Sequence, residues 1–132
     1  MSIANSIWRG IAVTESFDDL SVLQSMRIVT TKIEHLEGEE AVGTFHFHHV
    51  EVNDADVDQV ATLVASVIKP SWFLHLVSAS GENMKVIFRD NQFNIEKGDD
   101  QAMQEVIAYG KKNGIHEDQL QLHRLFDNPY DE

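Results

Sequence analysis

The alternation of apolar and polar residues divides the first half of the chain into short extended and helical segments. Residues Ile7–Thr14 read as a short extended piece. A short helix is expected next, because Ser16 and Asp19 have the spacing of a capping box. Segments Met26–Leu36 and Thr44–Val52 are rich in β-branched and aromatic residues. With a polar, glycine-bounded turn between them, they predict an antiparallel hairpin.

Two longer segments have the period of amphipathic helices. The first is expected to begin at Asn53 or Asp54 and to end near Lys69, just before a proline. Its apolar residues recur at the i, i+3, i+4 and i+7 positions that place side chains on one helix face: Val57, Val60, Ala61, Val64 and Ile68. The second helix is expected to open after Gly98 and to end at Gly114, a residue suited to a left-handed C-terminal position.

Three further strands are predicted between these two helices, at Ser71–Ala79, Met84–Arg89 and Gln92–Glu96. The expected fold class is α+β, with an antiparallel sheet of about four to five strands and two main helices packed on one face. A ferredoxin-like arrangement is one option among several. The chain has no linker or repeat, so residues 1–132 are expected to form a single domain with a frayed tail at about 124–132.

Composition excludes several classes of function. The 132 residues include 22 Asp and Glu against 10 Lys and Arg, which gives a net charge of −12. Such a field repels nucleic acid and anionic lipid and favours a basic protein partner. The absence of Cys excludes thiol catalysis, disulfides and iron–sulfur ligation. No apolar run approaches the ~20 residues of a membrane helix, and the N-terminus has no signal-peptide pattern, so a cytoplasmic location is expected.

The histidines are the main candidate for chemistry. His46 and His48 are two residues apart on a predicted strand and therefore share a face, while His75 lies in another strand. Three imidazoles with an open position would suit a zinc-type metal or a small ligand. The competing interpretation is structural, because Val50 and Val52 share the face of His46 and His48, and histidines there can serve only to satisfy hydrogen bonds.

Other signatures of catalysis are missing from the sequence. The acidic run Asp54–Asp58 resembles a calcium loop but lacks its glycine and its final glutamate. There is no phosphate-binding glycine loop and no nucleophile elbow. Whether the chain is an enzyme is therefore left open, with a non-catalytic role favoured.

Several short blocks taken together resemble a widespread group of small, uncharacterised prokaryotic proteins. The blocks are residues 11–16, 46–52, 72–75, 85–88 with Phe93, and 109–115 with Gln119 and Leu120. The resemblance implies one compact domain and carries no activity with it. It also implies that His46 and His75 recur, whereas the position of His48 is more often aromatic. This favours a buried His46–His75 pair over a three-histidine metal site.

Three functional hypotheses follow from the sequence. The leading one is a binding or regulatory module that contacts a basic protein, as in an immunity- or antitoxin-like role. The second is a metal- or small-ligand-binding protein, or an enzyme, that uses His46, His48 and His75. The third is a homodimer formed through the edge of the predicted strand Gln92–Glu96.

Overall fold

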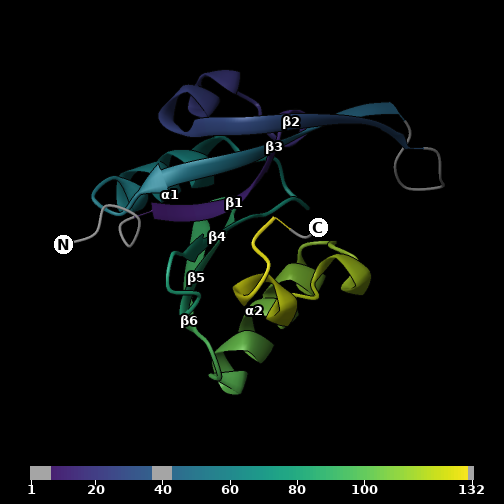
Figure 1. Cartoon of the computed structure of the whole chain (residues 1–132). Helices are drawn as coiled ribbons and strands as arrows, with labels where there is room; N and C mark the ends of the chain where they lie inside the picture. Colours follow the sequence, from purple (N-terminus) through teal and green to yellow (C-terminus); the bar gives the residue numbers. More distant parts are fainter. Residues whose placement is uncertain (1–6, 37–42, 131–132) are drawn as a thin grey trace.

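A computed structural model describes residues 7–36 and 43–130, which contain strands, α-helices and short 3-10 turns (Figure 1). The strands are β1 (Ile7–Val13), β2 (Arg27–Leu36), β3 (Gly43–Asn53), β4 (Leu74–Ser78), β5 (Asn83–Phe88) and β6 (Asn91–Glu96). The α-helices are α1 (Val57–Val67) and α2 (Asp100–Lys112). Short 3-10 turns occupy Thr14–Ser16, Leu20–Ser25, Glu117–Gln119 and His123–Phe126.

The strands form one antiparallel sheet in the order β2-β3-β1-β4-β5-β6. The predicted hairpin of β2 and β3 is confirmed, although most of its turn, residues 37–42, lies outside the described residues. β1 is inserted between β3 and β4, with Ile11 opposite His49 on one side and His75 on the other. The N-terminal strand therefore lies near the centre of the sheet, and β2 and β6 form its two edges.

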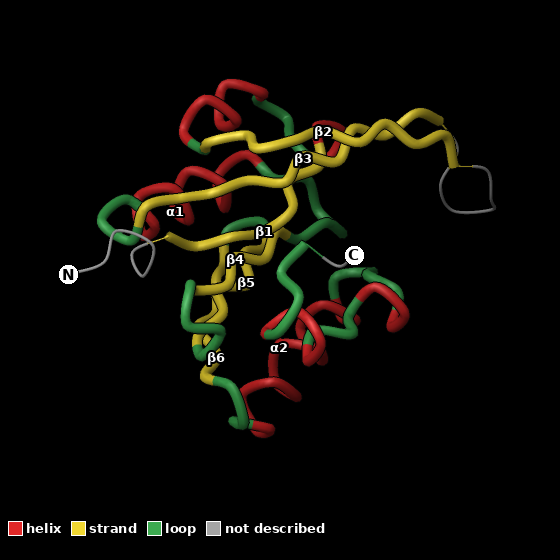
Figure 2. The backbone as a smooth tube through the Cα atoms, viewed as in Figure 1, coloured by secondary structure: helices red, strands yellow, loops and turns green. Residues whose placement is uncertain are grey.

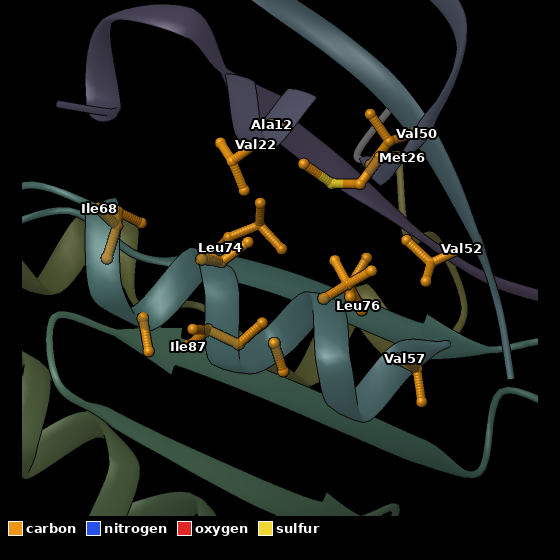
Figure 3. Packing of buried hydrophobic residues seen from close by; sticks show 14 of the residues in the cluster. Ala12, Val22, Met26, Val50, Val52, Val57, Ile68, Leu74, Leu76 and Ile87 are labelled. Atoms are coloured by element: carbon orange, nitrogen blue, oxygen red, sulfur yellow. The ribbon is translucent and has the colours of Figure 1, made fainter. Parts of the chain in front are cut away.

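One face of the sheet packs against α1 (Figure 3). Leu74 and Leu76 of β4 point to this face, and Val50 and Val52 of β3 join them. The helix contributes four residues of the stripe that the sequence predicted, and Ile68 follows directly after its last residue; all five are buried: Val57, Val60, Ala61, Val64 and Ile68. A Val or Ile side chain contributes ~1.5–3 kcal/mol when it is fully removed from water. This face forms one of the two halves of the core.

The opposite face of β4, β5 and β6 packs against α2 and the C-terminal turns. Val77 follows Leu76 along β4 and points the other way, as strand geometry requires. Val86 of β5 and Ile95 of β6 are buried with it. Residues of α2 and of the segment that follows it complete this second half of the core: Met103, Val106, Ile115, Leu120, Leu122, Leu125 and Phe126.

The architecture is α+β as expected, but it differs from the expectation in two respects. The sheet has six strands, because the N-terminal extended piece is a full member of it. The two α-helices lie on opposite faces of the sheet, as the two separate clusters of buried residues show. The side chains of β4 and β5 are buried in both directions, which requires a covering layer on each face of the sheet.

Local helix starts also differ from the prediction. Ser16 caps no helix, because its hydroxyl donates to the Val13 carbonyl at 2.6 Å. Asp19 instead caps the following 3-10 turn, where its carboxylate accepts from the Ser21 amide at 2.9 Å. α1 begins at Val57, later than predicted, because β3 continues to Asn53, which pairs with Ile7.

The ends of β2 and β3 project from the sheet as a two-stranded ribbon (Figure 2). β1 follows β3 only as far as the pair Val13–Phe47, so residues 43–46 pair with β2 alone. A β-bulge between Ile28 and Thr30 lies opposite Val50 and His49, in the part of β3 that also pairs with β1. Bulges increase strand twist locally.

The C-terminal segment packs on the body of the protein. Leu125 and Phe126 are buried in the second core, and Asp127 forms an ion pair with Lys97 at 2.7 Å. The expected fraying of the tail from about residue 124 stays a prediction; the structure describes this segment up to residue 130. Within the described ranges, no helix is long and apolar enough to cross a bilayer.

Candidate functional site

Glu15 and His46 form a closely held pair at the base of the ribbon. Glu15 belongs to the 3-10 turn that follows β1, and its Oε1 accepts the backbone N–H of His46 at 2.6 Å. Its Oε2 lies 2.8 Å from Nδ1 of the His46 ring. Burial alone would raise the pKa of Glu15, but the hydrogen bonds from the His46 backbone and ring outweigh it and lower that pKa.

This geometry fixes the tautomer of His46. A carboxylate can only accept, so Nδ1 carries the proton and Nε2 holds the lone pair of the neutral ring. The side chain of His46 is 40% exposed. A carboxylate that orients an imidazole in this way is the outer-shell arrangement found around many metal-ligating histidines.

His48 has a different environment, although it lies on the same face. It is buried, with Nε2 2.6 Å from the Thr14 hydroxyl and Nδ1 2.8 Å from the Thr31 hydroxyl. Burial lowers the pKa of His48, the charge of His46 lowers it further, and Glu15 partly opposes both. Both ring nitrogens are engaged. His48, on β3, therefore links the 3-10 turn that follows β1 to the strand β2.

His75 lies on the other face of the sheet. Its neighbours Leu74 and Leu76 point toward α1, so its ring points toward the α2 side. There Nε2 donates to the Pro129 carbonyl at 2.6 Å. β1 also separates β4 from β3.

The three histidines singled out by the sequence therefore do not converge. His46 and His48 share one face, and His75 faces the opposite side. The buried His46–His75 pair that the resemblance implied is absent for the same reason. In the described part of the chain, no three His, Asp or Glu side chains are placed to hold one metal ion.

Further polar and aromatic side chains lie on the same face of the sheet as His75, the side of α2. The ring of His49 stacks on Tyr130 with centroids 4.4 Å apart and planes 5° apart. Arg9 and Glu51 are paired across β1 and β3, with Nε and Oε2 3.2 Å apart. Burial raises the pKa of the Tyr130 hydroxyl, and the charge of Glu51 adds to this shift.

The outer edge of the sheet at β2 carries a third feature. Three of its residues are large, apolar and exposed: Val29 at 52%, Ile33 at 65% and Ile28 at 41%. They lie along an edge strand of ten residues, whose outer side pairs with no other strand in the described ranges. Such an edge is a template on which another extended chain can pair.

Sequence reasoning missed Glu15, Tyr130 and the position of β2. Glu15 and His46 are 31 residues apart, and Tyr130 is 81 residues from His49. No local spacing signals such pairs. The β-branched content of β2 was visible, but its place at the edge depends on the insertion of β1, which pattern alone does not give.

Searches against known protein families, curated proteins and solved structures found no match to this chain. The resemblance to small prokaryotic proteins therefore stays a prediction. The function has to be argued from the geometry alone.

Proposed function

We propose that this protein is a non-catalytic binding module that pairs, along β2, with an extended basic segment of another protein. The observation that carries the proposal is the exposure of Val29 and Ile33 on an uncovered edge strand. Strand addition draws affinity from backbone hydrogen bonds and specificity from alternating side chains. β2 offers both along ten residues.

The charge of the chain defines the partner. The net charge of the chain is −12. Arg27, a cation of β2, is already paired with Glu51 at 3.8 Å. A basic segment would be attracted to a chain of this charge, whereas two copies of a chain that each carry −12 repel one another. This supports a different protein as the partner over a homodimer through β2.

The bulge limits where the partner can pair. Between Ile28 and Thr30 the register of β2 shifts, which interrupts regular pairing at that point. The regular part of the edge thus runs from Thr30 to Leu36, and its last residues belong to the projecting ribbon. A partner strand of about six or seven residues fits this length at roughly 3.3 Å per residue.

Site-specific cross-linking tests the proposal. A photoreactive residue is placed at position 33 or, as a matched control, at Leu63, an apolar residue of α1 that is 43% exposed. In the native host, we expect one basic protein to cross-link at position 33 and not at position 63. The purified pair should then bind with an affinity that falls as salt rises.

Three outcomes would contradict the proposal. These are a cross-link to a second copy of the chain, equal products at positions 33 and 63, and no product at position 33. A dimer that instead cross-links through β6 would favour the homodimer hypothesis.

The Glu15–His46 pair supports a second candidate function, binding of a transition metal or small ligand. Its specific support is the oriented, partly exposed ring of His46. His48 is held by Thr14 and Thr31, and His75 lies on the other face, so His46 would be the ligand among the three. Calorimetric titration of tag-free protein with Zn²⁺ tests this. Heat that disappears in His46→Ala and persists in His116→Ala supports the site, and absence of heat removes it.

A further inference from the structure

The C-terminal residues Asn128–Tyr130 lie across a part of the sheet that α2 leaves uncovered. In Figure 1 this yellow segment rises from the last 3-10 turn toward β4 and β1. Its root is firmly held, because Phe126 is buried and Asp127 is paired with Lys97. Beyond Asp127 the segment contacts the sheet through a backbone carbonyl and an aromatic ring.

Pro129 and Tyr130 make the contacts of a short bound peptide. The Pro129 carbonyl accepts from Nε2 of His75 at 2.6 Å. The Tyr130 ring stacks on His49, and its hydroxyl donates to the Val50 carbonyl over 3.4 Å. One backbone acceptor and one aromatic ring are thus recognised by two histidines, which are buried at 6% and 5% exposure.

The surface beneath this segment is mixed, unlike the apolar face under α2. It carries His49, His75 and the ion pair of Arg9 with Glu51, and Ile11 lies between the two histidines in the register of the strands. Water can solvate the polar groups when the segment leaves, whereas Ile11 offers an apolar contact to a bound peptide. Beside it lies a cavity of about 280 Å³, for which Pro129 forms one wall and Arg9, Ser78 and Gly81 form others.

We infer that this face of β1, β3 and β4 is a peptide-binding surface that the chain's own C-terminal segment keeps occupied. Its ligand is an extended segment of another protein that presents a proline followed by an aromatic residue. This surface lies on the opposite side of the sheet from α1 and does not involve the edge of β2, so it is independent of the proposed function.

Tethering explains why the chain occupies its own site. A segment joined by a short linker has an effective concentration on the order of millimolar. A partner peptide at a lower concentration must therefore have a higher affinity for the surface than the tethered segment has, or it must reach the protein after the segment has been displaced. Removing the segment should convert a closed surface into an open one.

The test uses the full chain and a variant that ends at Asp127, which keeps the Lys97 ion pair. The probe is N-acetyl-Asn-Pro-Tyr-amide, added at millimolar concentration while the ring signals of His49 and His75 are followed by NMR. We expect saturable shifts in the shortened chain and at least ten-fold weaker binding to the full chain. His49→Ala, and a probe with Ala in place of Tyr, should each weaken binding at least ten-fold.

Two results would overturn the inference: no saturable shift in a shortened chain that remains folded, or equal binding of the Tyr and Ala probes. If the shortened chain does not fold, Tyr130→Ala in the full chain replaces it. That variant should bind the probe more tightly than the wild type does, and failure to do so overturns the inference equally.

Discussion

Ile33 of β2 lies opposite His46 of β3, and these two paired residues meet different surroundings. The ring of His46 is held by Glu15, whereas Ile33 is 65% exposed. The base of the ribbon is therefore fixed by polar contacts. Its outer apolar residues contribute little to the core, which leaves them available for a partner.

Replacing Ile33 separates stability from binding. Ile33→Ser should change the free energy of unfolding by no more than about 0.5 kcal/mol, because an exposed side chain loses little on truncation. It should weaken partner binding at least ten-fold. Denaturant unfolding and a binding titration measure the two effects. Leu63→Ser is the control, and equal losses of affinity in both variants would refute a role for β2.

Gly10 is required where β1 passes β4. A Cβ atom at this position would collide with the backbone oxygen of His75. Backbone of a central strand cannot yield easily, so Gly10→Ala should lower the free energy of unfolding by about 3 kcal/mol or more.

Gly110→Ala is the matched control for Gly10→Ala. There the added Cβ atom would meet the end of the Leu120 side chain at 2.8 Å, which is flexible. The gain in helix propensity, about 1 kcal/mol, offsets part of the overpacking. Chemical denaturation of both variants should therefore show a clearly smaller loss for Gly110→Ala, and a reversed order would contradict the packing described for β1 and β4.

The pKa shifts of His48 and Glu15 predict loss of stability in acid. The pKa of His48 is lowered below 6.5 in the folded protein, so the unfolded chain takes up this proton first. Its contribution is complete above pH 6.5 and is lost as the pH falls below that value. The pKa of Glu15 is lowered below 4.5, so its contribution is lost only below about that pH.

His48→Gln should remove the first of these two steps. The Gln amide can still contact the hydroxyls of Thr14 and Thr31 but does not titrate. The free energy of unfolding, measured from pH 7.5 to 5, should then depend less on pH than in the wild type. His123→Gln, an exposed change, should keep the wild-type slope. If the free energy of unfolding of His48→Gln depends on pH as strongly as that of the wild type, His48 is not the source of this pH dependence.

Lys85 and Asp58 should respond unequally to substitution. The Lys85 side chain is buried, with Nζ 2.9 Å from Asp58 and 2.7 Å from Asn94, whereas Asp58 is 89% exposed. Lys85→Met returns Asp58 to water and should cost less than about 1 kcal/mol. Asp58→Ala leaves the buried Lys85 ammonium without its carboxylate partner. It should lower the free energy of unfolding by more, about 1–2 kcal/mol. Thermal unfolding of both variants checks the order, and a larger loss for Lys85→Met would contradict it.

The sequence predicted the elements far better than their arrangement. The stripe of α1 and the strands β2 to β6 follow from local periodicity, which needs no knowledge of neighbours. The insertion of β1 between β3 and β4 depends on contacts such as Gly10 against His75, which no local pattern encodes. The faces covered by the two helices depend in turn on that strand order.

The candidate site was predicted only in part. His46 and His48 do share a face, as the alternation along β3 indicates, and they meet Glu15, Thr14 and Thr31 there. His75 could not be placed from the sequence, because its side of the sheet is set by the register of β4 against β1. Because the tail was expected to be frayed, the candidate site did not include Tyr130. Its contact with His49 is visible only in three dimensions.

The most direct test of the proposed binding surface is hydrogen exchange of the backbone amides in the presence of the purified basic partner. The account predicts that exchange slows along β2, most strongly from Thr30 to Leu36, and stays unchanged along the opposite edge strand β6. Slowed exchange at β6 with none at β2 would contradict it.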